Sequence, residues 1–151
     1  MTKIIFVCLG NICRSPMAEF IMKDLVNKAN LNDRFSICSA GTSGYHDGED
    51  MHHQTKALLH SKNISTKGFY SQKLNLKMCE DNDLIIVMDN SNYNDVVKNF
   101  PDCKHKIQKI TSYAKDLEYN EVPDPWYSGD FNETYMILSK ACDGLLYFLY
   151  K

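Results

Sequence analysis

Short apolar runs alternate along the chain with segments whose apolar residues recur at helical spacing. The first run, residues 3–7, is β-branched and aromatic and has no polar alternation, which is typical of a strand buried on both faces of a sheet. Residues 84–88 form an equally apolar run between two aspartates, and residues 35–40 and 106–110 form weaker ones. The pattern therefore predicts four strands.

Helical periodicity follows each of the first three runs and ends the chain. Ser15-Pro16 supplies a hydroxyl N-cap and a proline for the first helical turn, ahead of apolar residues at helical spacing as far as Ala29. Further helices are predicted over residues 51–62, about 91–99 and 130–150. A polar loop containing Pro123-Asp124-Pro125 precedes the last of them.

Strands that alternate with helices favour right-handed βαβ units, and hence an α/β fold with a parallel sheet covered on both faces. We expect residues 1–151 to form a single domain, because no repeat, linker or second core interrupts the pattern. In such sheets ligands bind beyond the carboxyl ends of the strands, at a point where successive crossovers go to opposite faces. Cys8 lies at the carboxyl end of the first predicted strand.

The composition is that of a globular protein and narrows the choice of partners. Of the 151 residues, 44% are hydrophobic and 24% are charged, which argues against a disordered or low-complexity chain. Seventeen basic and 19 acidic residues give a net charge of −2. The protein is therefore not expected to have the overall positive potential that attracts nucleic acid or an anionic membrane. The sequence predicts no nucleic-acid or membrane partner, and only local phosphate recognition.

The start of the chain and its cysteines indicate a cytoplasmic protein. Only four successive apolar residues, Ile4 to Val7, precede Cys8, which is too short a run for a secretory signal or a membrane span. The six cysteines are then expected to be free thiols in a reducing compartment. Core positions are predicted for Cys38, Cys79, Cys103 and Cys142.

Residues 8–15 join the first strand to the first helix and carry candidate chemistry. The backbone N–H groups of such a loop can surround an anion, and the helix N-terminus adds positive potential. These donors and Arg14 favour the thiolate form of Cys8, which is the nucleophilic form. Arg14 can hold two phosphate oxygens with its planar fork, and Ser15 can donate to the sulfur when it leaves. The loop therefore predicts a nucleophile, a phosphate clamp and leaving-group support.

The segment Val7-Cys8-Leu9-Gly10-Asn11-Ile12-Cys13-Arg14-Ser15-Pro16-Met17-Ala18-Glu19 resembles the active-site signature of the low-molecular-weight protein tyrosine phosphatases. Residues 39–45, 87–92 and 122–127 also match this family in order and approximate spacing. The resemblance implies a three-layer α/β/α fold with a four-stranded parallel sheet in the order 2-1-3-4. It further implies a phosphomonoesterase that acts on phosphotyrosine proteins and small aryl phosphates without metal or cofactor. We expect the enzyme to be a monomer.

The resemblance also implies catalytic roles for three residues. Cys8 is the nucleophile that forms a phosphocysteine, Arg14 binds the phosphate, and Asp124 is the general acid for the leaving phenolate. The chemistry independently needs such an acid, and the same group can activate water in the second step. The residues alone do not single out Asp124 from Asp116 or Asp130.

Other positions match the family's phosphate loop and its supports. The loop comprises Leu9, Gly10, Asn11, Ile12, Cys13 and Ser15 beside the nucleophile. Asn11 and Ser39 match residues that hold the loop in shape, and asparagine tolerates the left-handed backbone of a tight loop. Where the family commonly has a histidine in this network, the alignment places Gly68, a departure that bears on the rigidity of the loop.

A slot for a planar phosphorylated ring is predicted beside the loop, with walls formed by Tyr45, Trp126, Tyr127, Leu9 and Ile12. Related phosphoarginine phosphatases have threonine at the position of Ile12, so Ile12 favours an aryl phosphate. His46, Asp47 and Asp50 in the rim loop are candidates for peptide selection. The family also uses a pair such as Cys8 and Cys13 as a reversible disulfide.

Two other functions remain open. An arsenate reductase on the same fold also uses a cysteine-rich anion loop, but it needs two further redox cysteines close to the site, and Cys79 has no companion before Cys103. A non-catalytic phosphoprotein-binding module can dispense with the nucleophile or the acid, and both are present here. A dinucleotide-binding domain is disfavoured, because Gly10 is the only glycine before Arg34.

Overall fold

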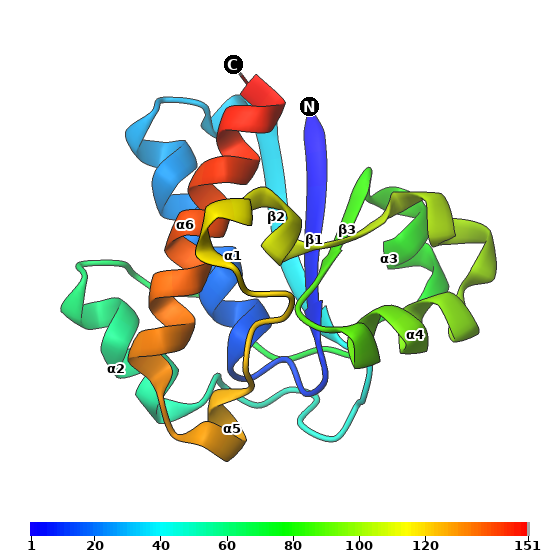
Figure 1. The fold of residues 1–151 in the computed structure, drawn as a ribbon, viewed down its shortest axis with the longest axis horizontal. Helices are drawn as coiled ribbons and strands as arrows, with labels where there is room; N and C mark the ends of the chain where they lie inside the picture. Colours follow the sequence, from blue (N-terminus) through cyan, green and yellow to red (C-terminus); the bar gives the residue numbers. More distant parts are fainter. Residues whose placement is uncertain (151) are drawn as a thin grey trace.

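Four parallel strands form one sheet in the order β2-β1-β3-β4 in the computed structural model, which describes residues 1–150 (Figure 1). The strands are β1 (Thr2–Cys8), β2 (Phe35–Gly41), β3 (Leu84–Val87) and β4 (Ile107–Lys109). Each lies within two residues of its predicted position. The parallel sheet predicted from the apolar runs and the strand order implied by the resemblance are both confirmed.

Helices cover both faces of this sheet and make three layers (Figure 1). One face carries α1 (Arg14–Lys28) and α6 (Phe131–Tyr150), with α2 (His53–Ser61) packed against both of these helices. The other face carries α3 (Leu76–Asp81) and α4 (Asn90–Asn99). The predicted α/β/α architecture is therefore confirmed. Within residues 1–150, no helix combines the length and apolar character needed to cross a membrane.

Alternate residues of β1 enter two separate cores. Ile4 and Phe6 belong to the larger core beneath α1 and α6, whereas Ile5 and Val7 belong to a second core beneath α3 and α4. Burial on both faces explains why this strand is uniformly apolar. Because side chains alternate along a strand, Cys8 lies on the same face as Ile4 and Phe6, and it joins the larger core.

The predicted start of the first helix is wrong by two residues. Helix α1 begins at Arg14, and its N-cap is Cys13, which makes no side-chain capping bond. The hydroxyl of Ser15 instead lies 3.0 Å from the Cys8 sulfur. Ser15, which the sequence suggested as the N-cap, therefore contacts the loop before the helix and does not cap the helix.

Several short elements lie largely outside the helices and strands predicted from the sequence. Helix α5 (Pro125–Ser128) and helix α3 each span less than two turns, too little to show a helical period. Four 3₁₀ segments complete the fold: η1 (Asn32–Arg34), η2 (Pro101–Lys106), η3 (Ile110–Tyr113) and η4 (Lys115–Leu117). Segments this short depend on their tertiary surroundings more than on local pattern.

Helix α6 approaches η3 closely at Gly144. A Cβ atom at this position would lie 2.0 Å from the carbonyl oxygen of Tyr113, far closer than nonbonded atoms allow. The absence of a side chain at Gly144 therefore sets how near the last helix can lie to the segment that follows β4.

We expect Gly144→Ala to lower the free energy of unfolding by about 2 kcal/mol, because the added methyl group overpacks this contact. The direction of this change tests the contact, because helix propensity alone would make the alanine variant more stable by about 1 kcal/mol. Urea denaturation followed by circular dichroism measures the change. Asp143→Ala, on an exposed position of the same turn, is the control and should change stability by less than about 0.5 kcal/mol. Unchanged stability in Gly144→Ala would contradict this account of the contact.

Candidate active site

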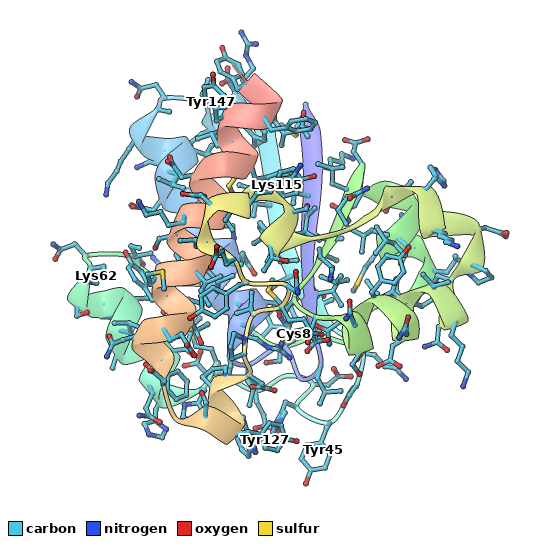
Figure 2. The ribbon with its side chains drawn as sticks, in the orientation of Figure 1. Cys8, Tyr45, Lys62, Lys115, Tyr127 and Tyr147 are labelled. Carbon is cyan, nitrogen blue, oxygen red and sulfur yellow. The ribbon has the colours of Figure 1, made fainter. Side chains whose placement is uncertain are left out.

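The loop between β1 and α1 lies at the carboxyl end of the sheet, the edge that the βαβ pattern predicts for ligand binding (Figure 1). Helix α5 lies at the same edge, although it is far away in the sequence. Figure 2 shows Cys8 at the end of β1, with Tyr45 and Tyr127 beyond it toward this edge.

The carbonyl groups of the loop point outward and are bonded by its surroundings. The carbonyl oxygens of Cys8, Leu9, Asn11 and Ile12 accept bonds of 2.7–2.9 Å from the N–H groups of Thr42, Ser43 and His52 and from the hydroxyl of Ser71. In a trans peptide the N–H group points away from its carbonyl group, so the N–H groups of the loop face its centre. This arrangement provides an anion-binding cradle.

Two backbone features allow the loop to close. Asn11 has a φ of 56°, the left-handed conformation that the sequence suggested asparagine would tolerate. Gly41, at the end of β2, leaves room for the loop, because a Cβ atom there would lie 2.8 Å from the Leu9 carbonyl oxygen and 3.1 Å from the Asn11 nitrogen. A side chain at Gly41 would displace the loop.

A buried network of polar side chains supports the loop behind the Cys8 sulfur. Asn11 donates from Nδ2 to the hydroxyl oxygens of Ser15 and Ser39, each at 2.9 Å. Its Oδ1 accepts from the Gln72 backbone N–H at 2.9 Å. The structure thus brings the predicted support residues Asn11, Ser15 and Ser39 together and adds the backbone of Gln72, which the sequence did not reveal.

Gly68, the position at which the resemblance implies a histidine in the family, takes no part in this network. It has a φ of +87°, and a Cβ atom placed there would meet nothing within 4 Å. The Ser39 hydroxyl donates instead to Glu19 Oε1 at 2.5 Å. Glu19 was not assigned a role from the sequence. A charged residue within a buried helical stretch is a signal that could have indicated one.

Arg14 is buried beside the loop and is held by acidic partners. Nη1 donates to Asp89 Oδ2 at 2.7 Å and to the Val122 carbonyl oxygen at 2.9 Å, and Nη2 lies 3.5 Å from Asp124 Oδ2. Burial by itself lowers the pKa of Arg14, but the negative charges of Cys8, Asp89 and Asp124 outweigh it and raise this pKa above its ordinary value. The guanidinium therefore stays charged.

Asp124 lies in the pocket beside Arg14. Its Oδ1 accepts from the Trp126 N–H at 3.0 Å and caps α5, and the prolines on either side fix two backbone angles. Asp116 lies in η4, and Asp130 accepts from the Glu133 N–H at 2.9 Å and does not line this pocket. The structure separates three aspartates that the residues alone, without the family resemblance, did not distinguish.

The pocket has a volume of about 430 Å³ and contains all the predicted wall residues. Its lining comprises Cys8, Leu9, Gly10, Ile12, Cys13, Arg14, Ser43, Tyr45, His46, Asp124, Trp126 and Tyr127. Tyr45 and Tyr127 are 84% and 80% exposed, so their rings stand at the mouth rather than in the core. His46 lies between Tyr45 and Trp126, with ring centroids 4.9 and 6.3 Å away. The pocket is thus lined by residues of the loop and has an aromatic rim.

Cys13 lines this pocket beside Cys8, and the other cysteines lie elsewhere. Burial, reinforced by the charge of Cys8, raises the pKa of Cys13 to about 12, so it is a neutral thiol at pH 7. Cys79, Cys103 and Cys142 are buried in the cores and Cys38 is half-buried. Cys79 and Cys103 lie against each other in the core beneath α3 and α4, but neither lines the pocket, where an arsenate reductase needs its redox pair. No three His, Cys, Asp or Glu side chains among residues 1–150 gather as metal ligands would.

Residues 3–151 match the family model described as low molecular weight phosphotyrosine protein phosphatase. The chain is 37% identical over 148 residues to the low molecular weight protein-tyrosine-phosphatase YfkJ of Bacillus subtilis, which covers 97% of this chain and 94% of YfkJ. The crystal structure of YfkJ matches this fold with a TM-score of 0.96, over 99% of this chain and 94% of that one.

Two further solved structures extend the comparison. The low molecular weight protein tyrosine phosphatase from Campylobacter jejuni, solved in solution, is 62% identical with a TM-score of 0.80, over 100% of this chain and 97% of that one. A Drosophila arginine phosphatase is 31% identical with a TM-score of 0.90, over 99% of both chains. The similarity therefore spans entire chains.

We expect Asp89→Asn to lower the free energy of unfolding by about 2 kcal/mol in phosphate-free buffer, because buried Arg14 loses its closest anion. Asp89 Oδ1 also caps α4 by accepting from the Asn92 N–H at 2.7 Å, and asparagine caps equally well. Urea denaturation measures the loss, and added inorganic phosphate should reverse part of it. Asp89→Ala removes both the charge and the helix cap, so it should be about 1 kcal/mol less stable than Asp89→Asn. Wild-type stability in Asp89→Asn would contradict this role of the ion pair.

Proposed function

Since this chain belongs to the low molecular weight phosphotyrosine protein phosphatase family and is a protein-tyrosine-phosphatase, we propose that it hydrolyses phosphotyrosine through a phosphocysteine on Cys8. Small aryl phosphates are substrates of the same site, and neither metal nor cofactor takes part. One observation carries the proposal: Asp124, which is 110 residues from Arg14 in the sequence, lines a single pocket with Cys8 and Arg14 of the loop.

In the first step the Cys8 sulfur attacks phosphorus, so that an S–P bond forms and the P–O bond to the tyrosine ring breaks. Arg14 and the inward N–H groups of the loop bind the nonbridging phosphate oxygens, whose charge they stabilise in the transition state. The Asp124 carboxyl group gives its proton to the departing phenolate oxygen. The position of Asp124 on the pocket wall, fixed as the cap of α5, supports this role.

In the second step water attacks the phosphocysteine, and the Asp124 carboxylate accepts a proton from that water. The S–P bond breaks, its electron pair returns to sulfur, and inorganic phosphate leaves. Ser15 Oγ, which lies 3.0 Å from the Cys8 sulfur, donates a hydrogen bond to the sulfur as its negative charge returns. Asp124 therefore acts as an acid first and as a base afterwards.

The preference for an aryl ring follows from the rim of the pocket. Tyr45, Trp126 and Tyr127 offer aromatic faces at the mouth, and Leu9 and Ile12 add apolar contacts to the lining. The structural similarity to an arginine phosphatase makes phosphoarginine the competing substrate. An apolar side chain at Ile12 gives the guanidinium of phosphoarginine no hydrogen-bond partner and favours phosphotyrosine.

The proposed setting is the cytoplasm, where a single-domain monomer acts on phosphotyrosine proteins without a nucleic-acid or membrane partner. Six free cysteines, one of them the nucleophile, suit a reducing compartment. The net charge of −2 supports recognition by the local phosphate cradle rather than by a general electrostatic field.

Steady-state hydrolysis of phosphotyrosine, phosphoserine and phosphoarginine peptides in metal-free buffer tests the reaction. Wild type should turn over the tyrosine peptide alone, and Cys8→Ser should be inactive. Asp124→Asn keeps an oxygen to cap α5 and should lower kcat about 10²–10⁴-fold through loss of the proton donor. Asp130→Asn, which alters a cap outside the pocket, is the matched control and should retain full activity.

Other results of that experiment distinguish the alternatives. Preferred hydrolysis of phosphoarginine would contradict the aryl specificity and leave the cysteine chemistry standing. Reduction of arsenate with a thiol donor, without phosphatase activity, would replace the proposal by the reductase. Binding of the phosphotyrosine peptide without turnover would establish a binding module.

A second prediction concerns reversible oxidation of the pocket thiols. Peroxide oxidises the Cys8 thiolate to a sulfenic acid, and the Cys13 sulfur displaces hydroxide from it, giving a disulfide and, after protonation, water. A thiol reductant should then restore wild type but not Cys13→Ser. Because the pKa of Cys13 is raised to about 12, its thiolate fraction grows about tenfold per pH unit below that value, so disulfide formation should accelerate between pH 7 and 9. Cys38→Ser, outside the pocket, is the control and should recover as wild type does. Equal recovery of Cys13→Ser would contradict the prediction.

A further inference from the structure

A row of side chains along α1 leads from the active-site loop to the protein surface. Ser15, Glu19 and Lys23 are spaced four residues apart, so they lie one above another on the same face of the helix. Glu19 is only 6% exposed, whereas the side chain of Lys23 is 43% exposed. A buried carboxylate thus lies one helical turn beyond the hydroxyl that contacts Cys8.

Both oxygens of the Glu19 carboxylate are occupied. Oε1 accepts from the Ser39 hydroxyl at 2.5 Å, and Oε2 accepts from Lys23 Nζ at 2.6 Å. A buried carboxylate is costly unless it is paired and hydrogen-bonded, and here it is both. The two reaction steps described above make no use of this group.

The bonds around Asn11 determine the direction of the network. The Asn11 side-chain oxygen faces the Gln72 N–H, which directs both Nδ2 hydrogens to Ser15 and Ser39. An amide nitrogen has no lone pair to accept a bond, so both serines must act as acceptors toward Asn11. The orientation of the amide is therefore set by a backbone donor.

Each serine hydroxyl has a single hydrogen of its own to donate. Ser39 gives this hydrogen to Glu19, the acceptor 2.5 Å away. Ser15 has the Cys8 sulfur at 3.0 Å and the Ala40 carbonyl oxygen at 3.5 Å, so the sulfur is its nearer acceptor. The bonds therefore run in a consistent direction from Asn11 outward, with Cys8 at one end and Glu19 at the other.

We propose that Glu19, neutralised by Lys23, is a positioning residue for Cys8. Its carboxylate holds the hydrogen of Ser39 away from Asn11, so that Ser39 presents a lone pair to the amide. The amide is then fixed between two acceptors and keeps the hydrogen of Ser15 directed at the sulfur. This inference rests on the proposed function, in which Cys8 is the nucleophile and leaving group.

The effect of Glu19 should appear in turnover rather than in phosphate affinity. The bond from Ser15 matters most when the S–P bond breaks and negative charge returns to Cys8. Phosphate itself is bound by Arg14 and the loop N–H groups, which Glu19 does not contact. A residue that merely held the loop together would alter both properties.

The test uses Glu19→Ala and Glu19→Gln with p-nitrophenyl phosphate as substrate and inorganic phosphate as inhibitor. Glu19→Ala should lower kcat about tenfold, the cost of one lost hydrogen bond, while the phosphate inhibition constant stays within about twofold. Glu19→Gln keeps an oxygen for Ser39 and should return kcat to within about threefold of wild type. Asp24→Ala removes the carboxylate of another ion pair of α1, with Lys28 at 2.8 Å, and should leave both values unchanged.

Alkylation of Cys8 by iodoacetamide, with inorganic phosphate as the protecting ligand, gives a second readout that needs no phosphoester. It should be several-fold slower in Glu19→Ala than in wild type and Glu19→Gln. This result would support the role of Glu19 even if the proposed substrate proved wrong. If the proposed function is wrong, the wild-type protein itself will hydrolyse no aryl phosphate.

Three results would overturn the inference: unchanged kcat and alkylation in Glu19→Ala, equal losses of kcat and phosphate affinity, or a Glu19→Gln variant as impaired as Glu19→Ala. If Glu19→Ala does not fold, Ser39→Ala removes the same link from the other side. That variant should then show the loss of kcat with retained phosphate affinity, and full activity in it would also overturn the inference.

Discussion

The loop between β1 and α1 imposes the constraint on which the rest of the site depends. Turning its N–H groups toward one point forces its carbonyl groups outward, and each buried carbonyl group then needs a donor from elsewhere in the fold. The donors come from the segments after β2 and before α2, and from the Ser71 hydroxyl. The left-handed backbone of Asn11 and the missing side chain of Gly41 serve the same closure. The cradle is thus a property of the whole carboxyl edge of the sheet, although its residues are contiguous.

Arg14 has acidic partners at this edge before any substrate arrives. Arg14 is buried, and Asp89 and Asp124 provide its counter-charge from the ends of two other segments. Both aspartates also cap helices, so each is held by a backbone bond and has one oxygen left for the guanidinium. Helix capping and the contact with Arg14 therefore use different oxygens of each carboxyl group.

The sequence predicted the features that depend on local pattern. The apolar run of β1 shows its burial on both faces, and residues 8–15 hold the proposed nucleophile Cys8, Arg14 and the Ser15 hydroxyl within one loop. Features that depend on tertiary contact were out of reach. No spacing indicates that Asp89 lies against Arg14, or that Asp124 and not Asp130 lines the pocket. The predicted N-cap at Ser15 was wrong for the same reason, because that hydroxyl is drawn to Cys8 across the loop.

Helix α1 shows how a tertiary requirement can still leave a trace in the sequence. Residues 14–22 are buried around the whole circumference of the helix, so polar residues in this stretch must find partners inside the protein. Ser15 and Glu19 do so through the network behind Cys8, and Lys23 carries the balancing charge at the point where the helix reaches solvent. The four-residue spacing of these side chains follows from that geometry. The position of this polar row on an otherwise buried helix supports the proposal that Glu19 helps to position the loop.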